Sequence, residues 1–271
     1  MTAQGHDDLL AQEPEVIAGR AAEVGRGRLD RSLLDALITG FIGGLEVSLG
    51  GLVAMIVLGA ALRADPRLGL YGGLALAGLV FPIGFLLVII GRSELFTENF
   101  LIPVLAVVRG QRRLRSLVGV WALSWVGNLA GCAVLAALLS VHDAIGEPIL
   151  FGYQRYTEYK LGLDVPGLFV SAVVAGMTMS VLTWLLMAVR HPVGKIIVIW
   201  AAGYVIFATN LSHVIVSAAI LFVGFSRSGH SLLDLARYIG ITTFGNLVGG
   251  IGLVTLFRLA QALEKERRRE G

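Results

Sequence analysis

The sequence predicts an all-α membrane protein with six transmembrane helices, and three observations support this fold class. The chain of 271 residues is 56% hydrophobic and only 15% charged, with a mean hydropathy of +0.78, which is outside the range of soluble domains. Long segments contain no Asp, Glu, Lys or Arg. Two of these apolar stretches are interrupted by polar motifs at corresponding places in the two halves of the chain.

The charge-free segments account for most of the expected helices. Each reaches the roughly 20 residues that a helix needs to cross about 30 Å of hydrocarbon. They are residues 68–91, 116–141, 165–189, 196–226 and 238–257. A sixth span at 33–62 qualifies although Glu46 lies at its middle, and strands of a β-barrel, which alternate polar and apolar residues, are a poor alternative. We therefore expect a six-helix domain over 33–263, between tails at 1–32 and 264–271.

The basic residues predict the orientation of these helices. With the N-terminus in the cytoplasm, fifteen Lys and Arg residues lie in or beside cytoplasmic segments, and six lie on the opposite side. The positive-inside rule then favours a cytoplasmic location for both termini. The basic flanks would face anionic lipid, so the high isoelectric point requires no nucleic-acid partner.

Two polar segments are expected at the membrane surface. The first 32 residues are polar with mixed charge, so we expect no secretory signal there, and they contain apolar residues at helical spacing. These residues are Leu9, Leu10, Val16, Ile17, Ala21, Ala22 and Val24. We interpret this tail as a short amphipathic helix on the bilayer surface, with a gating role as the alternative. The longest external loop, 142–164, is interpreted as a solvated cover over the outer mouth.

Two polar motifs indicate where a substrate path would run. Residues 93–99 read Ser-Glu-Leu-Phe-Thr-Glu-Asn, and residues 209–213 read Thr-Asn-Leu-Ser-His. About thirty residues after each motif comes a Gly-Asn-Leu-x-Gly signature, at 127–131 and at 245–249. This arrangement predicts an internal repeat. Interrupted helices in corresponding positions of two halves are the best sequence indication of a transport site.

The two Gly-Asn-Leu-x-Gly signatures are better explained by helix packing than by chemistry. Small residues let helices approach closely where the hydrophobic effect gives no drive to associate. The amides of Asn128 and Asn246 lie in this setting, and each is expected to tie its helix to a neighbouring one.

The interruptions themselves carry the candidate pore residues. Backbone freed inside a membrane is tolerated only when it is buried in protein or faces a watery cavity, and the N-termini of half-helices suit a small anion. Thr97 offers a hydroxyl at the first motif, while Asn210, Ser212 and His213 lie in the second. The sequence has no Ser-His-Asp grouping, zinc motif, P-loop or CxxC pair. We therefore predict transport rather than catalysis, with no catalytic residues, cofactor or metal.

Together, the Glu-Leu-Phe-Thr element at 94–97, the two signatures and the histidine in the fifth span resemble the formate/nitrite transporter family, over about 33–263. The resemblance implies an aquaporin-like inverted repeat with helices two and five broken, assembled as a homopentamer in membrane lipid. It implies one pore per protomer for small monovalent anions or their protonated acids, in the cytoplasmic (inner) membrane of a bacterium. It also implies that Thr97 and His213 face each other in the pore.

The same resemblance implies hydrophobic constrictions on both sides of His213. By position, Leu95 fits the cytoplasmic constriction, and Phe81 with Ile206 or Phe207 fits the outer one. Moving a bare anion into such a pore costs on the order of 20 kcal/mol by idealised Born estimates, and still several kcal/mol after the protein relaxes. A neutral weak acid avoids most of this cost. His213 would either donate a proton or polarise the site through Thr97, so we expect flux that depends on pH through His213.

Some residues depart from the family pattern. An acid usually precedes the histidine, but here it is Ser212, and Glu98 replaces a small residue. Ser180 follows Met179 where a pore asparagine is common, and Lys160 is the one candidate for a lysine near the outer entrance.

Four charged residues, Glu46, Arg92, Glu94 and Glu98, lie near the first motif. Isolated charges at this depth cost about 2.5–3.5 kcal/mol each, so we expect Arg92 to pair with Glu46 or Glu98. Two alternatives remain open: a channel for a cation or small neutral solute, and a non-conducting membrane scaffold or sensor.

Overall fold

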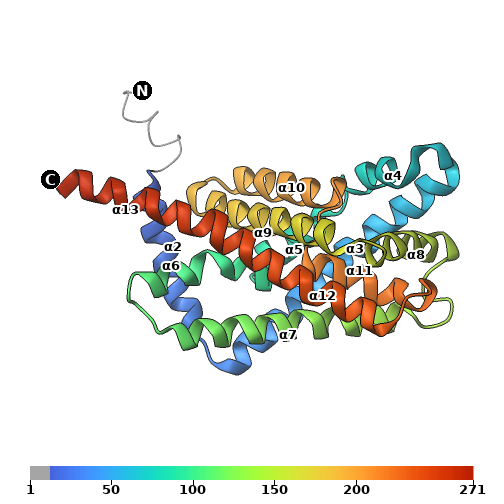
Figure 1. Ribbon diagram of the computed structural model, residues 1–271, viewed down its shortest axis with the longest axis horizontal. Helices are drawn as coiled ribbons and strands as arrows, with labels where there is room; N and C mark the ends of the chain where they lie inside the picture. Colours follow the sequence, from blue (N-terminus) through green and yellow to red (C-terminus); the bar gives the residue numbers. More distant parts are fainter. Residues whose placement is uncertain (1–12, 271) are drawn as a thin grey trace.

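The computed structural model describes residues 13–270, and every regular element in this range is a helix. Most helices run along the long axis of the molecule, and both terminal helices lie at the same end, called here the terminal end (Figure 1). The α-helices are α2 Pro14–Leu29, α3 Leu33–Ala64, α4 Gly69–Ala77, α5 Pro82–Gly91, α6 Ile102–Val108, α7 Leu114–Leu139, α8 Glu147–Leu161, α9 Val165–Ala188, α10 Pro192–Ala208, α11 Val214–Gly224, α12 Leu232–Leu247 and α13 Leu256–Glu270. Short 3₁₀ helices are η1 Pro66–Leu68, η2 Phe96–Phe100 and η3 Phe225–Arg227, and η4 Val248–Thr255 is a π-helix.

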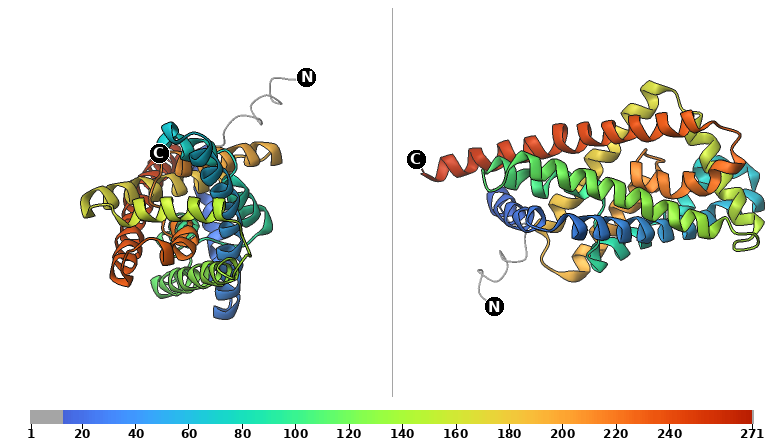
Figure 2. Two further views of the ribbon diagram at one scale, coloured as in Figure 1. Left: turned by 90° about the vertical axis from the view of Figure 1, so that its right-hand side faces the viewer. Right: turned by 90° about the horizontal axis from the view of Figure 1, so that it is seen from below.

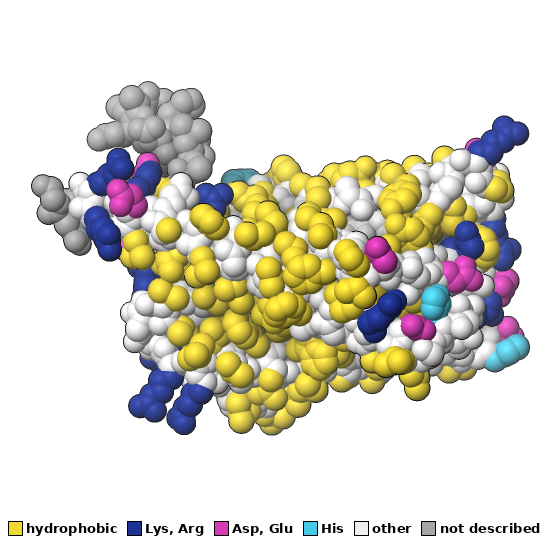
Figure 3. All heavy atoms as spheres, in the orientation of Figure 1, with side chains coloured by type: hydrophobic (Ala, Val, Ile, Leu, Met, Phe, Trp, Pro, Cys, Tyr) yellow, Lys and Arg dark blue, Asp and Glu magenta, His cyan; other side chains and the backbone are white. Residues whose placement is uncertain are grey.

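Five helical segments of the described residues are long and apolar enough to cross a membrane. They are Leu33–Ala64, Pro66–Gly91, Leu114–Leu139, Val165–Ala188 and Leu232–Arg268, and they coincide with five of the predicted spans. The remaining predicted span, 196–226, is divided between α10 and α11, each shorter than a crossing helix. Apolar side chains cover the middle of the face seen in Figure 3, and most charged side chains gather toward its two ends. This distribution fits a surface that faces hydrocarbon in its middle.

The glycine signatures pack helices together, as predicted. A Cβ on Gly127 of α7 would lie 2.6 Å from the carbonyl oxygen of Leu37 in α3, and one on Gly131 would collide with the carbonyl of Phe41. In the second half, a Cβ on Gly249 would collide with the carbonyl of Val173 in α9. Only glycine allows these backbones to approach so closely, which joins α3 to α7 and α9 to the last helical segment.

The N-terminal helix has a different place from the one predicted. The apolar residues from Val16 to Val24 do form a helix, α2, but it lies across the terminal end of the bundle instead of on the bilayer surface (Figures 1 and 2). Ile17 and Ala21 are buried against Leu105 of α6 and against α13, which gives this apolar face a protein partner. Leu9 and Leu10 lie outside the described residues.

The segment 142–164 is also more than a solvated cover. Its helix α8 packs against α3 and α11 at the end opposite the terminal end, with Tyr153, Tyr156 and Lys160 buried. Buried residues at spacings of three and four place one face of α8 in the interior. The loop interpretation was therefore wrong for 147–161.

Candidate functional site

The first interruption, residues 92–101, separates α5 from α6. Gly91 ends α5, Arg92 turns the chain with a left-handed φ of 63°, and the backbone is extended at Leu95 before the short η2 helix. Thr97 is fully buried, and Glu98 is only 6% exposed. A polar, non-α-helical segment is thus enclosed by protein, the condition under which a membrane tolerates it.

The second interruption, residues 209–213, separates α10 from α11. Asn210 adopts a left-handed φ of 57°, which asparagine tolerates better than most residues, and the chain re-enters a helix at Val214. Ser212 and His213 are fully buried. His213 caps α11, because its Nδ1 accepts a hydrogen bond from the Val216 amide at 3.1 Å.

The side-chain amides of Asn128 and Asn246 hold these two interruptions in equivalent ways. Asn128 accepts a hydrogen bond from the Phe96 amide at 2.7 Å and donates to the carbonyl oxygens of Gly40 at 2.7 Å and Glu94 at 2.8 Å. Each bond satisfies a backbone group at the interruption or on the neighbouring helix α3. The predicted packing role of Asn128 is confirmed and is more specific than expected.

Asn246 repeats this pattern in the second half. It accepts from the Val214 amide at 2.9 Å and donates to the carbonyl oxygens of Ala172 at 2.7 Å and Ser212 at 3.0 Å. Both amides therefore use one acceptor and two donors to connect an interruption with a long neighbouring helix. This match is the structural form of the internal repeat that the sequence predicts.

The two interruptions meet at Thr97 and His213. Thr97 Oγ1 lies 2.7 Å from His213 Nε2, so the expected contact between these residues is present. Because Nδ1 accepts from Val216, a neutral ring carries its proton on Nε2 and donates it to Thr97. The Thr97 hydroxyl proton is then free to point elsewhere.

Aromatic and aliphatic side chains surround this pair. Phe81 stacks on Phe207 with ring centroids 4.6 Å apart, and Phe85 lies edge-on to His213 at 6.1 Å. Leu95 and Ile206 are also buried, at 0% and 1% exposure. The polar contact between Thr97 and His213 is thus enclosed by apolar groups, which strengthens its electrostatic effect.

Lys160 of α8 approaches the second interruption from the opposite end. Its Nζ donates to the Asn210 carbonyl oxygen at 2.6 Å and to Ser212 Oγ at 3.3 Å, and it lies 5.5 Å from the centre of the Tyr156 ring. No described carboxylate is within ion-pair distance of this buried amine. The second interruption therefore has a buried amine next to it and no compensating acid, and burial lowers the pKa of Lys160 to about 7.

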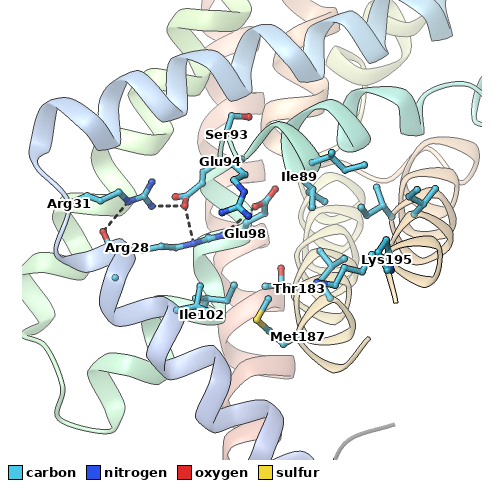
Figure 4. Close-up of a pocket in the computed structure, with 18 residues that line it drawn as sticks. Arg28, Arg31, Ile89, Ser93, Glu94, Glu98, Ile102, Thr183, Met187 and Lys195 are labelled. Carbon is cyan, nitrogen blue, oxygen red and sulfur yellow. Dashed lines mark hydrogen bonds and ion pairs between the residues drawn. The ribbon is translucent and has the colours of Figure 1, made fainter. Parts of the chain in front are cut away.

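The charge network at the first interruption differs from the prediction. Glu94 pairs with Arg28 of α2 at 2.9 Å and with Arg31, which lies between α2 and α3, at 2.5 Å, and Glu98 lies 3.8 Å from Arg28 (Figure 4). Within residues 13–270, no hydrogen bond or ion pair joins Arg92 to Glu46 or Glu98, so the predicted pairing of Arg92 was wrong.

The local backbone explains this difference. Arg92 occupies the left-handed turn after α5, and its side chain is exposed, whereas the end of α2 and the turn after it bring Arg28 and Arg31 to Glu94. Glu46 instead accepts a hydrogen bond from the hydroxyl of Ser93. Sequence reasoning missed Arg28 and Arg31 because they lie in the segment that was treated as a tail. The signal in the sequence was the pair Glu94 and Glu98, because two buried carboxylates require cations beside them.

Several polar atoms near the interruptions have no hydrogen-bond partner in the described part of the chain. They are Glu98 Oε1, Ser180 Oγ and both side-chain atoms of Asn210. Ser180 lies in α9 beside Gly250 of η4, and no hydrogen bond of the described residues links it to Thr97 or His213. Among residues 13–270, no group of three His, Cys, Asp or Glu side chains is arranged to hold a metal ion.

An open cavity of about 620 Å³ adjoins the first interruption at the terminal end. Figure 4 shows Arg28, Glu94, Glu98, Thr183 and Lys195 around it. Its walls come from α2, α5, α9 and α10 together with the interruption. The polar part of this wall includes the arginines and glutamates that pair with one another, together with Arg92, Ser93, Thr183 and Lys195.

Comparisons with known proteins agree with this geometry. The family described as formate/nitrite transporter matches residues 15–260. The formate channel BtFdhC of Bacillus thuringiensis is 29% identical over 251 residues, which cover 91% of this chain and 94% of that protein. A solved FNT family ion channel has a TM-score of 0.75 at 22% identity, covering 90% and 96% of the two chains. A pentameric formate channel with formate bound has a TM-score of 0.71 at 17% identity, covering 85% and 98%.

Proposed function

The chain belongs to the formate/nitrite transporter family and is a multi-pass membrane protein, and we propose that it conducts small monovalent anions or their protonated acids. The observation that supports this proposal best is the contact between Thr97 and His213, which joins the two interruptions among buried apolar side chains. The relatives named as formate channels support formate as the first substrate to test.

The hydrogen bonds indicate how the central pair would treat a substrate. A neutral His213 donates through Nε2 to Thr97, which leaves the threonine hydroxyl proton available to an anion or acid in the pore. A fixed donor in an apolar surround stabilises a partly dehydrated anion without having to reorganise. Thr97 is the proposed substrate donor, and His213 sets its direction.

The same bonds give a reason for pH dependence. A second proton on His213 would occupy Nδ1, the atom that now accepts from the Val216 amide. Protonation would therefore break the N-terminal cap of α11 and place a positive charge next to Thr97. We propose that the affinity of the site for an anion changes with this step, so that flux depends on pH through His213.

The buried apolar side chains are proposed to form two constrictions. Leu95 would narrow the path on the side of the terminal end, and Phe81 with Phe207 and Ile206 would narrow it on the other side of His213. A neutral acid crosses such constrictions at a much lower free-energy cost than the bare anion. Asn210 and Ser212, next to Lys160, would be the polar groups at the far constriction.

We propose six crossings, in an aquaporin-like inverted repeat. Helices α10 and α11 together would form the fifth crossing, broken at 209–213, and the second would be broken at 92–101. We propose that the terminal end lies in the cytoplasm of a bacterium, and the excess of basic residues near this end supports the orientation. In a protein whose Cys132 has been replaced, a cysteine at Arg155 should label from outside and one at Arg113 only from inside. The reverse pattern would contradict this topology.

A homopentamer with one pore in each protomer is the proposed assembly. It is supported by the likeness to a solved channel that is described as pentameric and by large apolar side chains on the outer surface of the protomer. The measured mass of the complex in a mild detergent should correspond to five chains. A monomer or trimer at several protein concentrations would contradict the proposal.

A liposome assay tests the proposed function. Purified protein is reconstituted, and the fluxes of formate, methylammonium and glycerol are compared with those of liposomes without protein. We expect a protein-dependent flux of formate that exceeds the other two. The unpartnered oxygen of Glu98 is the one observation that favours a cation path, and a larger methylammonium flux would support that reading. No protein-dependent flux of any solute would favour a scaffold or sensor.

A further inference from the structure

Arg28 of α2 contacts three polar side chains of the first interruption, which are Glu94, Glu98 and Asn99. Arg28 Nε lies 2.9 Å from Glu94 Oε1, and Nη1 donates to Asn99 Oδ1 at 2.9 Å. Its Nη2 lies 3.8 Å from Glu98 Oε2. A planar guanidinium is suited to such divergent contacts, whereas a lysine amine would present a single point of charge.

Glu98 is the residue that most needs this compensation. It follows Thr97 directly, is 6% exposed, and its Oε1 has no hydrogen-bond partner among the described residues. It also lines the cavity at the terminal end, through which a substrate would reach Thr97. An ionised carboxylate at this point would repel an approaching anion unless a cation lay beside it.

The other cations around the cavity do not replace Arg28. Arg31 is engaged by Glu94, Arg92 is exposed, and Lys195 is half-buried on α10 with no ion pair to Glu98 in the described residues. Solvent and salt screen exposed charges, while a buried pair is screened much less. Arg28 is thus the cation with the shortest link to Glu98.

Helix α2 is held firmly enough to keep Arg28 in this place. Ile17 and Ala21 are buried against α6 and α13, and Arg20 donates to the Met187 carbonyl oxygen at 3.2 Å. The helix is therefore built into the terminal end of the bundle, in contrast to a tail on the membrane surface.

We propose that Arg28 determines the ion selectivity of the path, by cancelling the charge of Glu98 and fixing the polar side chains of the first interruption. This inference rests on the proposed function as an anion path. It assigns to α2 a part in conduction: without Arg28, Glu98 would turn the cavity into a site that holds small cations and excludes anions.

Four variants test the inference in liposomes: Arg28→Gln, Glu98→Gln, the double variant, and Arg26→Gln as control. Arg26 removes the same charge from the same helix, and no ion pair links it to the interruption. We expect Arg28→Gln to lower formate flux about tenfold or more and to raise the ratio of methylammonium to formate flux. The double variant should regain most of the formate flux, because Arg31 still pairs with Glu94 and no buried carboxylate remains uncompensated.

The outcomes separate this inference from the proposed function. If Arg28→Gln has the same formate flux and ion selectivity as Arg26→Gln, the proposed role of Arg28 is wrong. The proposed function would still stand in that case, provided that the wild-type protein conducts formate. If Arg28→Gln fails to assemble, the double variant decides. Recovery of both assembly and flux supports charge compensation, and failure to recover either one overturns it. A wild-type protein that conducts no formate would instead contradict the proposed function itself.

Discussion

The first interruption (92–101) and the second (209–213) fix their backbone in the same way but balance their charges differently. In each, one asparagine makes three hydrogen bonds, to an amide and a carbonyl of the interruption and to a carbonyl of a long helix. At the first, two carboxylates meet two arginines, one at the end of α2 and one in the turn that follows it. At the second, the amine of Lys160 meets only backbone and hydroxyl oxygens.

This difference assigns separate tasks to the two ends of the path. In our proposal, a protonated Lys160 attracts an anion to the end formed by α8, whereas at the first interruption the two arginines balance the two glutamates. The repeated asparagines provide a common scaffold that either arrangement of charge can use. The backbone of the site is thus a property of the repeat, and its electrostatics are a property of the segments α2 and α8 that lie outside it.

The largest effect is expected from the asparagines, because they serve the shared scaffold. Asn128→Leu and Asn246→Leu should each strand buried backbone groups, at about 1–3 kcal/mol for each group. We expect both variants to lose the assembled protein in mild detergent, and to similar extents. Thr178→Ala is a suitable control, since that hydroxyl bonds only within its own helix. If one asparagine variant assembles like wild type and the other does not, then the two interruptions are not equivalent.

A smaller effect, on flux more than on assembly, is expected at Lys160. Lys160→Met removes the cation next to the second interruption and leaves the Asn210 carbonyl without its donor. We expect formate flux to fall about tenfold, which corresponds to about 1.4 kcal/mol. Arg155→Gln is the matched control, because it removes a charge from the exposed face of the same helix. Equal flux in the two variants would show that the amine does not act on the anion.

The smallest effect is expected at the surface of the terminal end, where Asp30 pairs with Arg112. The Arg112 guanidinium lowers the pKa of Asp30, so this pair favours the folded state above the usual carboxyl pKa and is lost as the pH falls below it. Both groups are exposed, and such pairs contribute little to stability. Asp30→Asn should leave the thermal stability in detergent at pH 7 nearly unchanged. A large loss would mean that this link is needed to hold α2 over the first interruption.

The sequence predicted those features that depend on local pattern. Four charge-free runs and the apolar run at 33–62 predicted five segments that the structure contains, and the Gly-Asn-Leu-x-Gly signatures predicted close packing at Asn128 and Asn246. These predictions succeed because apolar length and glycine spacing are properties of nearby residues. The contact between Thr97 and His213 was instead implied by the resemblance to the family, since the two residues lie far apart in the sequence.

Partners from distant segments could not be predicted in the same way. Arg92 is the arginine closest in sequence to Glu94 and Glu98, but the left-handed turn at Arg92 leaves its side chain exposed. The true partners, Arg28 and Arg31, are more than sixty residues away, in a segment that sequence alone presents as a polar tail. The burial of α8 was missed for the same reason: its polar composition conceals one apolar face.

The central claim is that the two interruptions form a single site at Thr97 and His213, and the pH profile of formate flux tests it most directly. Flux into liposomes is measured between about pH 5 and 8, the range over which an unperturbed histidine titrates, for wild type and for His213→Asn. The flux of liposomes without protein is subtracted at each pH, because formic acid itself crosses lipid. We predict that His213→Asn assembles normally and has a flat profile where the wild type does not. An unchanged profile without the imidazole would show that His213 is a packing residue and would contradict the account.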